Sequence, residues 1–192
     1  GSRLYEVFSN GTFSDLGDIG DDAGHTPVQM FPNGRQLFVV SAGQAYCHTG
    51  TEIVTLNLGE LSGTVSTNLT VVDWTGGDTF DLTMAGHSIT INAVVYTVAS
   101  VRGDGKQITL TATAGVQTNV AYTATLALTA RTGAFLDGYF IAARPDSKQF
   151  NISDLYEGLV WDPLEFGVKE GYPDNIASIL ADHEELWIFG DE

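Results

Sequence analysis

Five side chains of the 192-residue sequence, four histidines and one cysteine, could bind a soft metal ion. They are His25, His48, His87, His183 and Cys47. Only Cys47 and His48 are close in the sequence, and adjacent residues of a strand point to opposite faces. Structural zinc sites use closely spaced pairs of cysteine or histidine, and the sequence contains no such pair. We therefore expect no metal site.

Four aspartates near the N-terminus loosely resemble a calcium-binding loop. They are Asp15, Asp18, Asp21 and Asp22, within the segment SDLGDIGDDAG. The segment lacks the alternating ligand spacing and the closing bidentate glutamate of an EF-hand. A solvated acidic turn is the preferred interpretation, and we expect no bound cofactor.

A group of carboxylates beside aromatic residues could hydrolyse or bind sugars, because glycosidases use paired acids. The acids are Asp146, Asp154, Asp162 and Glu165, and the aromatics are Tyr156 and Trp161. Acidic turns that flank buried aromatics are also ordinary in all-β proteins. The sequence contains no nucleophile elbow of the G-x-S-x-G type. We therefore expect no catalytic residue, and the chain is not predicted to be an enzyme.

The charge of the chain is strongly negative and unevenly distributed. The formal net charge is −16, from 24 acidic and 8 basic residues. Residues 131–192 hold 13 acids and 4 bases, whereas residues 61–130 hold 4 acids and 2 bases. Tight binding to a phosphate backbone or to an anionic membrane requires clustered lysine and arginine, so we expect neither. The sequence contains no run of about 18 apolar residues, so we expect no membrane-spanning helix.

The composition favours a β-structured chain with a substantial core. Hydrophobic residues make up 43% and aromatic residues 10%, which argues against disorder. The 22 glycines indicate many tight turns, and the distribution of Val, Ile, Thr and aromatics favours strands. A single cysteine excludes an internal disulfide framework.

Three segments share one pattern, which is an apolar strand, a tight turn and a second strand with aromatic residues. Asn-Gly and Asp-Gly turns supply the positive φ angles that hairpins require. The segment 174–187 could also be read as a capped helix, but the shared pattern favours two strands. The turns are PNGR at 32–35, DG at 137–138 and DHEE at 182–185, and the second strands are 37–40, 139–142 and 186–189.

The spacing of these segments predicts propeller blades. Tyr139 and Leu186 are 47 positions apart, close to the period of about 40–50 residues typical of blades. Leu37 and Tyr139 are 102 positions apart, which predicts an insertion into one blade. A sandwich or an unrelated meander of hairpins is the alternative.

The insertion is a weakly charged segment rich in Thr, Val and Ala. Period-two alternation at 88–92 and 107–111 predicts strands. Turns are expected at Gly76-Gly77, Asn92-Ala93 and 103–105, which gives five or six short strands and a small barrel or sandwich. We therefore expect an all-β fold with a propeller-like segment at 1–60, an inserted β module at 61–129 and a propeller-like segment at 130–192.

The flanking segments resemble a specific family. The ordered motifs are the DGYF strand, the RPDSKQF turn, ISDLYEG, WD-x-L-x-F, the EG-x-PDN turn and DH-x-ELW-x-FG. Together with LYEVFSNGTFSDLGDIG and PVQMFPNGRQLFVVSAGQAY, they cover residues 3–48 and about 133–190. They look like the packaged-DNA stabilisation, or tail accessory and tail hub, proteins of short-tailed bacteriophages. Residues 61–128 interrupt the layout of that family and resemble a small β module of phage tail proteins.

The resemblance implies a virion structural protein of the tail or head–tail connector. Such a protein is a β-propeller subunit of a homo-oligomeric ring, which retains packaged DNA and joins the portal to the tail tip. The implied partners are other tail and portal proteins, and the implied place of synthesis is the cytoplasm of the bacterial host. Family members have no catalytic residues to carry over and are longer than this chain, so a fragment or an incomplete propeller is expected. An acidic surface would suit a channel wall along which DNA slides.

Two other functions remain open at this point. One is a carbohydrate-binding or carbohydrate-hydrolysing β-propeller that recognises a host, which the acids beside Tyr156 and Trp161 would serve. The other is a bacterial scaffold with no viral role.

Overall fold

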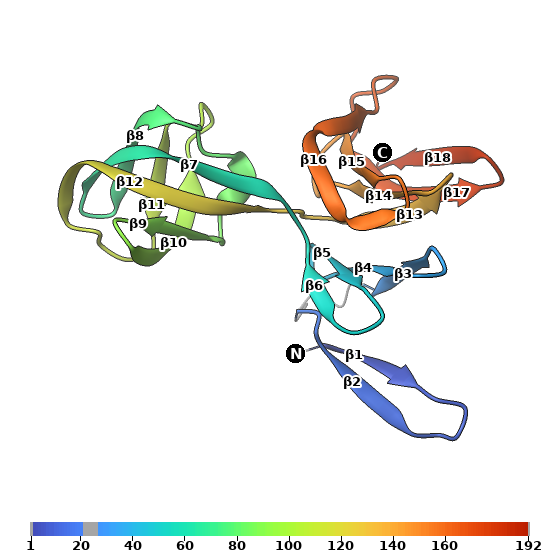
Figure 1. Cartoon of the computed structure of the whole chain (residues 1–192). Coiled ribbons are helices and arrows are strands. Elements are labelled where there is room, and N and C mark those ends of the chain that lie inside the picture. The colour runs from blue at the N-terminus through green and yellow to red at the C-terminus, as the bar shows by residue number, and fades with distance from the viewer. Residues whose placement is uncertain (1, 21–26, 192) are drawn as a thin grey trace. The chain divides into compact units, whose positions relative to one another are not determined.

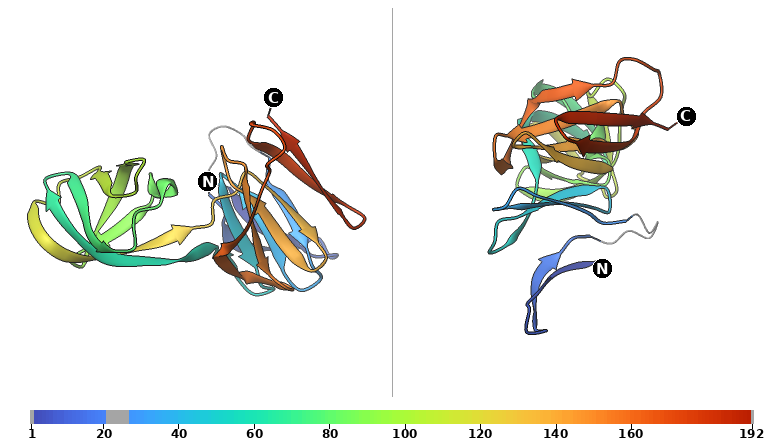
Figure 2. Two further views of the ribbon diagram at one scale, coloured as in Figure 1. Left: turned by 90° about the horizontal axis from the view of Figure 1, so that it is seen from above. Right: turned by 90° about the vertical axis from the view of Figure 1, so that its right-hand side faces the viewer.

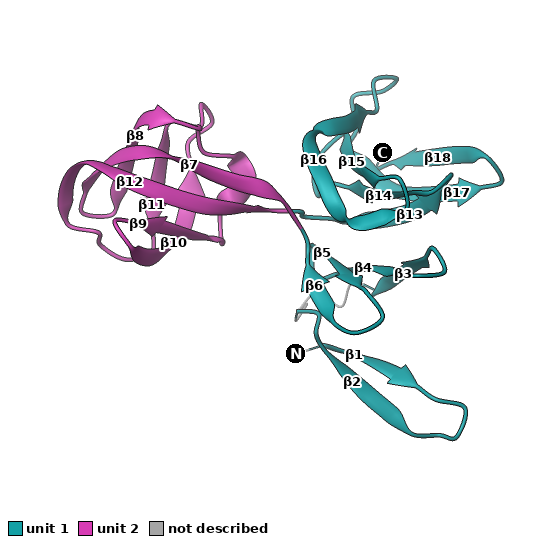
Figure 3. Cartoon of the chain, viewed as in Figure 1, with its two compact units in different colours: residues 1–56, 128–192 teal, residues 57–127 magenta. Residues whose placement is uncertain are grey.

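The computed structural model describes residues 2–20 and 27–191, which form an almost entirely β-sheet structure (Figure 1). The chain divides into two compact units (Figure 3). Unit 1 comprises residues 1–56 and 128–192, and unit 2 comprises residues 57–127. The predicted all-β fold class is confirmed. In the described ranges, no helix is long and apolar enough to cross a membrane.

Unit 1 consists, in its described residues, of antiparallel sheets whose strands follow one another in chain order. The N-hairpin is β1 (Arg3–Val7) and β2 (Phe13–Asp18), and sheet A is β3 (Gln29–Pro32), β4 (Leu37–Ser41), β5 (Gln44–His48) and β6 (Ile53–Thr55). Sheet B is β13 (Thr132–Leu136), β14 (Tyr139–Ala143), β15 (Gln149–Asp154) and β16 (Glu157–Val168), and the C-hairpin is β17 (Ile176–Asp182) and β18 (Glu185–Gly190).

The predicted turns of unit 1 join neighbouring strands. Gly34 has a φ of +89° between β3 and β4, and Asp137 has a φ of +50° between β13 and β14. His183, with a φ of +56°, lies in the turn between β17 and β18. The strand interpretation of this last segment is therefore confirmed, and the helical alternative is wrong.

The sheets of unit 1 pack face to face in chain order, from the N-hairpin to the C-hairpin (Figure 2, right). Leu4 of the N-hairpin and Val39 of sheet A belong to one buried hydrophobic cluster. Phe38, on the other face of sheet A, meets Phe140 of sheet B. The first strand of sheet B, β13, contacts the first strands on both sides, β3 and β17. Stacked four-stranded meanders whose first strands converge are the arrangement of consecutive propeller blades.

Unit 2 is inserted between two complete sheets of unit 1 and not within one of them. Sheet A ends with its fourth strand, β6, before the insertion, and sheet B starts with β13 after it. The prediction of an insertion into a blade is wrong for this reason. Three main-chain hydrogen bonds join Leu56 and Leu128, the residues of unit 1 on either side of unit 2, to each other and to Ala45. Ala45 N donates to Leu128 O, Leu128 N to Leu56 O and Leu56 N to Ala45 O, each at 3.0 Å.

Unit 2 is a closed six-stranded barrel with the order β10-β11-β8-β7-β12-β9. Its core consists mainly of aliphatic side chains, together with Met84 and the aromatic pair Phe80 and Tyr122. The predicted alternation is present, because Ile89 and Ile91 are buried between more exposed neighbours. The elements are β7 (Asn57–Asn68), β8 (Val71–Gly77), the 3-10 turn η1 (Leu82–Met84), β9 (Ser88–Ile91), β10 (Val94–Val101), β11 (Gln107–Leu110) and β12 (Val116–Ala127).

The turn predictions for unit 2 have mixed outcomes. Asn92 and Ala93 form the β9–β10 turn with φ of +48° and +65°, and residues 103–105 lie between β10 and β11. Gly76 and Gly77 do not form a turn, because both lie in β8 and pair with β7. A Cβ on Gly77 would lie 2.5 Å from the Cα of Gly63, so close strand contact explains the glycine. Two of the strands are longer than expected, at 12 residues each.

Tyr122 is expected to make unit 2 less stable as the pH rises into the alkaline range. Its hydroxyl donates to the main-chain oxygen of Asp78. Burial, and to a smaller extent the charge of Asp78, raises the pKa of Tyr122 from 10.0 to about 12. The unfolded state therefore loses this proton first as the pH rises, and unit 2 loses stability between about pH 10 and 12.

We expect calorimetry of the whole chain to show this loss as a lower unfolding temperature of unit 2. The transition of unit 2 is identified as the one whose temperature changes in a Val65→Ala variant. Tyr122→Phe should flatten the pH dependence, whereas Tyr172→Phe, an exposed change in unit 1, should leave it intact. Equal alkaline slopes for wild type and Tyr122→Phe would contradict this assignment.

Candidate functional site

The candidate metal ligands do not come together. His25 lies outside the described residues. The exposed His183 Nδ1 lies 2.9 Å from Asp182 Oδ1, and Cys47 is buried. Within residues 2–20 and 27–191, no group of three or more His, Cys, Asp or Glu residues could hold a metal ion.

Two of the four N-terminal aspartates lie on a strand. Asp15 and Asp18 belong to β2, so the predicted acidic turn is wrong for them. Asp15 accepts a hydrogen bond from Arg3 Nε at 2.7 Å, and this bond lowers the pKa of its carboxyl group. Asp21 and Asp22 lie outside the described residues.

The structure gives little support to a sugar site around Trp161. The Trp161 side chain is buried, and its indole nitrogen donates to Gly158 O at 2.9 Å. Its ring faces Phe38 at a centroid distance of 5.6 Å, so it offers no open platform for a sugar. Tyr156 is exposed and lines a cavity of about 320 Å³ with Asn33 and Arg35. The four acids proposed beside these aromatics, Asp146, Asp154, Asp162 and Glu165, are all exposed.

The most developed contact in unit 1 is an aromatic cluster between sheets A and B. Phe38 and Phe140 are fully buried, with ring centroids 5.4 Å apart. Phe31 and Trp161 pack against Phe38, and Phe135 packs against Phe140. Aromatic pairs at such distances contribute about 0.5–1.5 kcal/mol beyond the burial of their area. This cluster fixes the two sheets against each other.

Two glutamines, Gln29 of β3 and Gln36 in the turn between β3 and β4, also bind the main chain of sheet B. Gln36 Oε1 accepts from Gly158 N at 2.8 Å, while Gln36 Nε2 donates to Glu157 Oε1 at 2.7 Å. Gln29 Oε1 accepts from Thr132 Oγ1 at 2.9 Å and from Gly133 N at 3.3 Å. Each amide side chain replaces the solvent that these polar groups lose when the sheets pack.

Cys47 lies at the same contact and has a structural environment. A Cβ on Gly158 would lie 3.1 Å from the Cys47 sulfur, which shows how closely the strands approach. Burial, with a smaller contribution from the charge of Glu157, raises the pKa of Cys47 to about 12. Since the thiolate is the reactive species, this buried cysteine is a weak nucleophile at neutral pH.

The two hairpins at the ends of the stack each present an apolar face that no described sheet covers. On the N-hairpin this face carries Tyr5, Val7 and Phe13, which are 48%, 73% and 69% exposed, together with Asp15, which pairs with Tyr5 and accepts a hydrogen bond from Arg3. On the C-hairpin it carries Leu180, Trp187 and Phe189, which are 55%, 52% and 48% exposed. Contiguous apolar faces of this kind mark sites of protein contact. We call them the N-face and the C-face.

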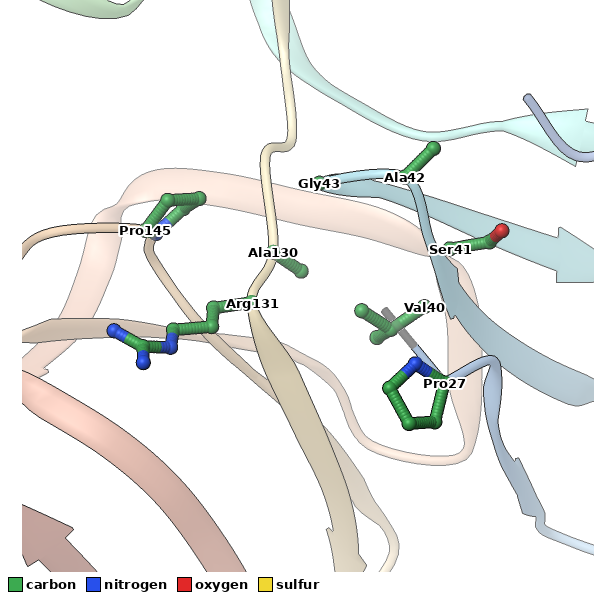
Figure 4. A pocket seen from close by; sticks show the side chains of 8 residues that line it. All are labelled: Pro27, Val40, Ser41, Ala42, Gly43, Ala130, Arg131 and Pro145. Carbon is green, nitrogen blue, oxygen red and sulfur yellow. The ribbon is translucent and has the colours of Figure 1, made fainter. Parts of the chain in front are cut away.

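A small cavity of about 100 Å³ lies where the chain enters β13 and where β4 turns into β5 (Figure 4). Its lining is mostly apolar, and Arg131 extends away from Val40 and Pro27 (Figure 4). The cavity offers no set of polar groups converging on a ligand. Its lining residues are Pro27, Val40, Ser41, Ala42, Gly43, Ala130, Arg131 and Pro145.

Sequence reasoning missed the residues that hold the sheets together. Nothing in the sequence distinguishes Gln29 and Gln36 from other polar strand-end residues, because their partners lie more than 100 positions away. The N-hairpin did leave a signal. Asn10-Gly11 is a hairpin turn of the same kind as Asn33-Gly34, and Asn10 Oδ1 accepts from Thr12 N at 3.0 Å.

One comparison with known proteins gave a match. A family model described as "Phage_stabilise: Bacteriophage P22 Gp10, beta-propeller" matches residues 1–192, which includes the whole of unit 2. Neither the search of curated proteins nor the search of solved structures gave a match.

Removal of the Gln36 side chain should weaken unit 1. Gln36→Ala leaves the buried Gly158 N–H without this acceptor, and we expect a loss of about 1–3 kcal/mol in the free energy of unfolding. Denaturation in urea would measure it. Gln107→Ala is the matched control, because Gln107 donates to exposed Asp73 in unit 2, and it should change stability by less than about 0.5 kcal/mol. Equal effects would contradict a role for Gln36 in the contact.

The Cys47 thiol should be unreactive in the folded chain. With its pKa raised to about 12, almost no thiolate exists at pH 8, and burial blocks access. We expect a disulfide reagent to modify the native protein roughly a thousand-fold more slowly than the urea-denatured protein. Native and denatured rates within a factor of ten would show that the contact between sheets A and B opens readily.

Proposed function

The chain belongs to the phage-stabilisation family of bacteriophage P22 Gp10, whose members are β-propellers, and we propose from this premise how it acts in the phage particle. It is a structural protein of the tail or head–tail connector that stabilises packaged DNA. We further propose that it helps to retain the DNA and that it joins the portal to the tail tip. It performs this role through assembly contacts and not through catalysis.

The observation that carries this proposal is the stack of sheets in unit 1. Sheets A and B are successive four-stranded blades, and Phe38, Gln29 and Gln36 fix one against the other. Such a contact holds blades rigidly side by side without forming a substrate cleft. Rigid packing suits a component that must hold its shape against the pressure of packaged DNA.

We propose that the partners are other tail and portal proteins and further copies of this chain in a ring. The N-face and the C-face support this proposal, since both are apolar faces available for contact. We place the protein at the head–tail junction of the particle, after synthesis in the bacterial cytoplasm.

The acids of unit 1 support only part of the channel-wall hypothesis. The first strands β3, β13 and β17, which converge in the stack, carry a single carboxylate, Asp182. The other described carboxylates of sheet B and the C-hairpin lie on later strands, turns and loops. A wall that repels DNA would therefore be formed by outer strands and turns, and not by the converging first strands.

We also propose that the two units have separate roles. Unit 1 is an interrupted propeller segment, and unit 2 is a decoration or interaction module of the kind found in phage tail proteins. The low charge of unit 2 and its own closed barrel support an independent module.

Phage particles assembled without this protein should lose their DNA. We expect heads to fill and then to release DNA, because the component that stabilises the packaged genome is absent. Nuclease protection of the genome and electron microscopy of the tails measure the outcome. The wild-type gene should restore both, and so should an Asp162→Ala variant, because the exposed Asp162 is not assigned a role. Particles that retain DNA and tails but fail only to attach to the host would overturn the proposal and favour the carbohydrate-binding alternative.

A further inference from the structure

The cavity beside Tyr156 lies between two turns that belong to different sheets. Asn33 and Arg35 come from the turn between β3 and β4 of sheet A, and Tyr156 comes from the turn between β15 and β16 of sheet B. Both sheets contain four paired strands. The hydrogen bond from Gln36 to Glu157, the residue after Tyr156, joins the two turns. The cavity of about 320 Å³ is therefore set by two complete blades, and its size falls within the range of small-ligand sites.

The Tyr156 ring is held in place and still offers an open surface. The main-chain nitrogen of Tyr156 donates to Gly138 O at 2.6 Å, and a Cβ on Gly138 would lie 2.9 Å from the ring atom Cε2. The ring also meets Phe135 at a centroid distance of 6.4 Å. Tyr156 is 60% exposed and has a φ of +57°, which is an unfavourable conformation for a bulky side chain. A strained, exposed and well-held residue of this kind indicates a binding role.

The polar groups of the cavity are mainly hydrogen-bond donors. The Arg35 guanidinium has five N–H donors and no acceptor. Asn33 Oδ1 already accepts from Arg35 N at 2.9 Å and from Gln36 N at 2.7 Å. Asn33 Nδ2 lies 3.4 Å from Gln36 Oε1 and has a second hydrogen to donate. A ligand of this cavity must therefore supply acceptor atoms.

The charge of Arg35 indicates which acceptor the cavity suits. In residues 2–20 and 27–191, Arg35 forms no ion pair, although the chain contains 24 acids. Glu157 Oε1 instead accepts from Gln36 Nε2 at 2.7 Å and from Leu159 N at 3.2 Å. A guanidinium binds a carboxylate through two parallel hydrogen bonds. A chain with a net charge of −16 also repels a doubly charged phosphate more than a singly charged carboxylate.

We propose that this cavity binds an aspartate or glutamate side chain of a partner protein. The carboxylate accepts from Arg35 and from Asn33 Nδ2, and an apolar residue beside it in the partner packs on the Tyr156 ring. A protein is favoured over a neutral sugar because sugar hydroxyls need acceptors as well as donors, and the acceptor of Asn33 is already used. The inference rests on the proposed function for the placement of this partner in the phage particle.

The test is a titration of the full chain with two acetylated and amidated dipeptides, Glu-Pro and Gln-Pro. The two differ only in carboxylate against amide, and proline supplies the apolar ring. Nuclear magnetic resonance would follow the ring protons of Tyr156 and the Nε–H of Arg35. The glutamate peptide should cause saturable shifts in the millimolar range. The glutamine peptide should bind about tenfold more weakly, because it lacks the charge that strengthens the hydrogen bonds.

Variants of the full chain assign the binding to this cavity. Arg35→Gln should weaken binding of the glutamate peptide about tenfold, and Tyr156→Ala should weaken it as well. Both side chains are exposed, so the variants should fold, which circular dichroism would confirm. Arg102→Gln is the matched control, because the exposed Arg102 of unit 2 already binds Asp104 at 2.8 Å. This control should bind the glutamate peptide as the wild type does.

Three results would overturn the site. They are the absence of a saturable shift with the glutamate peptide, equal binding of the two peptides, and equal losses in Arg35→Gln and Arg102→Gln. Tighter binding of glucose or glucuronate than of the glutamate peptide would overturn the protein partner and assign the cavity to a sugar. DNA retention by the particle is measured separately in the deletion experiment. The failure of this site and the failure of the proposed function are therefore distinguishable.

Discussion

The packing of Phe38 between sheets A and B is the interaction on which the rest of unit 1 depends. Phe38 lies on sheet A, and its ring meets Phe31, Phe140 and Trp161, which come from three different strands. Truncation of a buried phenylalanine costs about 3–5 kcal/mol, whereas an ordinary hydrogen bond contributes about 1 kcal/mol. The aromatic cluster therefore supplies the stability of the contact, and the glutamine bonds fix its alignment.

This contact also explains how the chain tolerates a 71-residue unit between two blades. The residues on either side of unit 2, Leu56 and Leu128, are hydrogen-bonded to each other and to Ala45 within unit 1. The blades therefore meet in the same way whatever the chain does between these two positions. Unit 2 buries its own core, so neither unit needs the other to satisfy its hydrophobic residues.

A stack of blades has a general problem at its two ends. Every internal sheet buries both faces, but a terminal sheet leaves one face and one edge open to water and to other chains. In this chain the N-hairpin contacts sheet A through β2 and β6, the C-hairpin contacts sheet B through β17, β13 and β14, and each hairpin exposes large apolar side chains. Exposed apolar faces of this kind are suited to contact with further protein.

The sequence by itself determined the local structure of this protein. Hairpin turns such as Asn33-Gly34 and Asp137-Gly138 follow from backbone sterics, and the alternation around Ile89 and Ile91 places one face inward, so the all-β class and most strands could be predicted. Chain spacing also revealed that an insertion exists. Only the tertiary structure decided that the insertion lies between blades, that Gly77 lies in a strand and that Trp161 is a core residue. These features depend on contacts between residues far apart in the sequence, such as Gln36 with Gly158, and no local pattern records such distances.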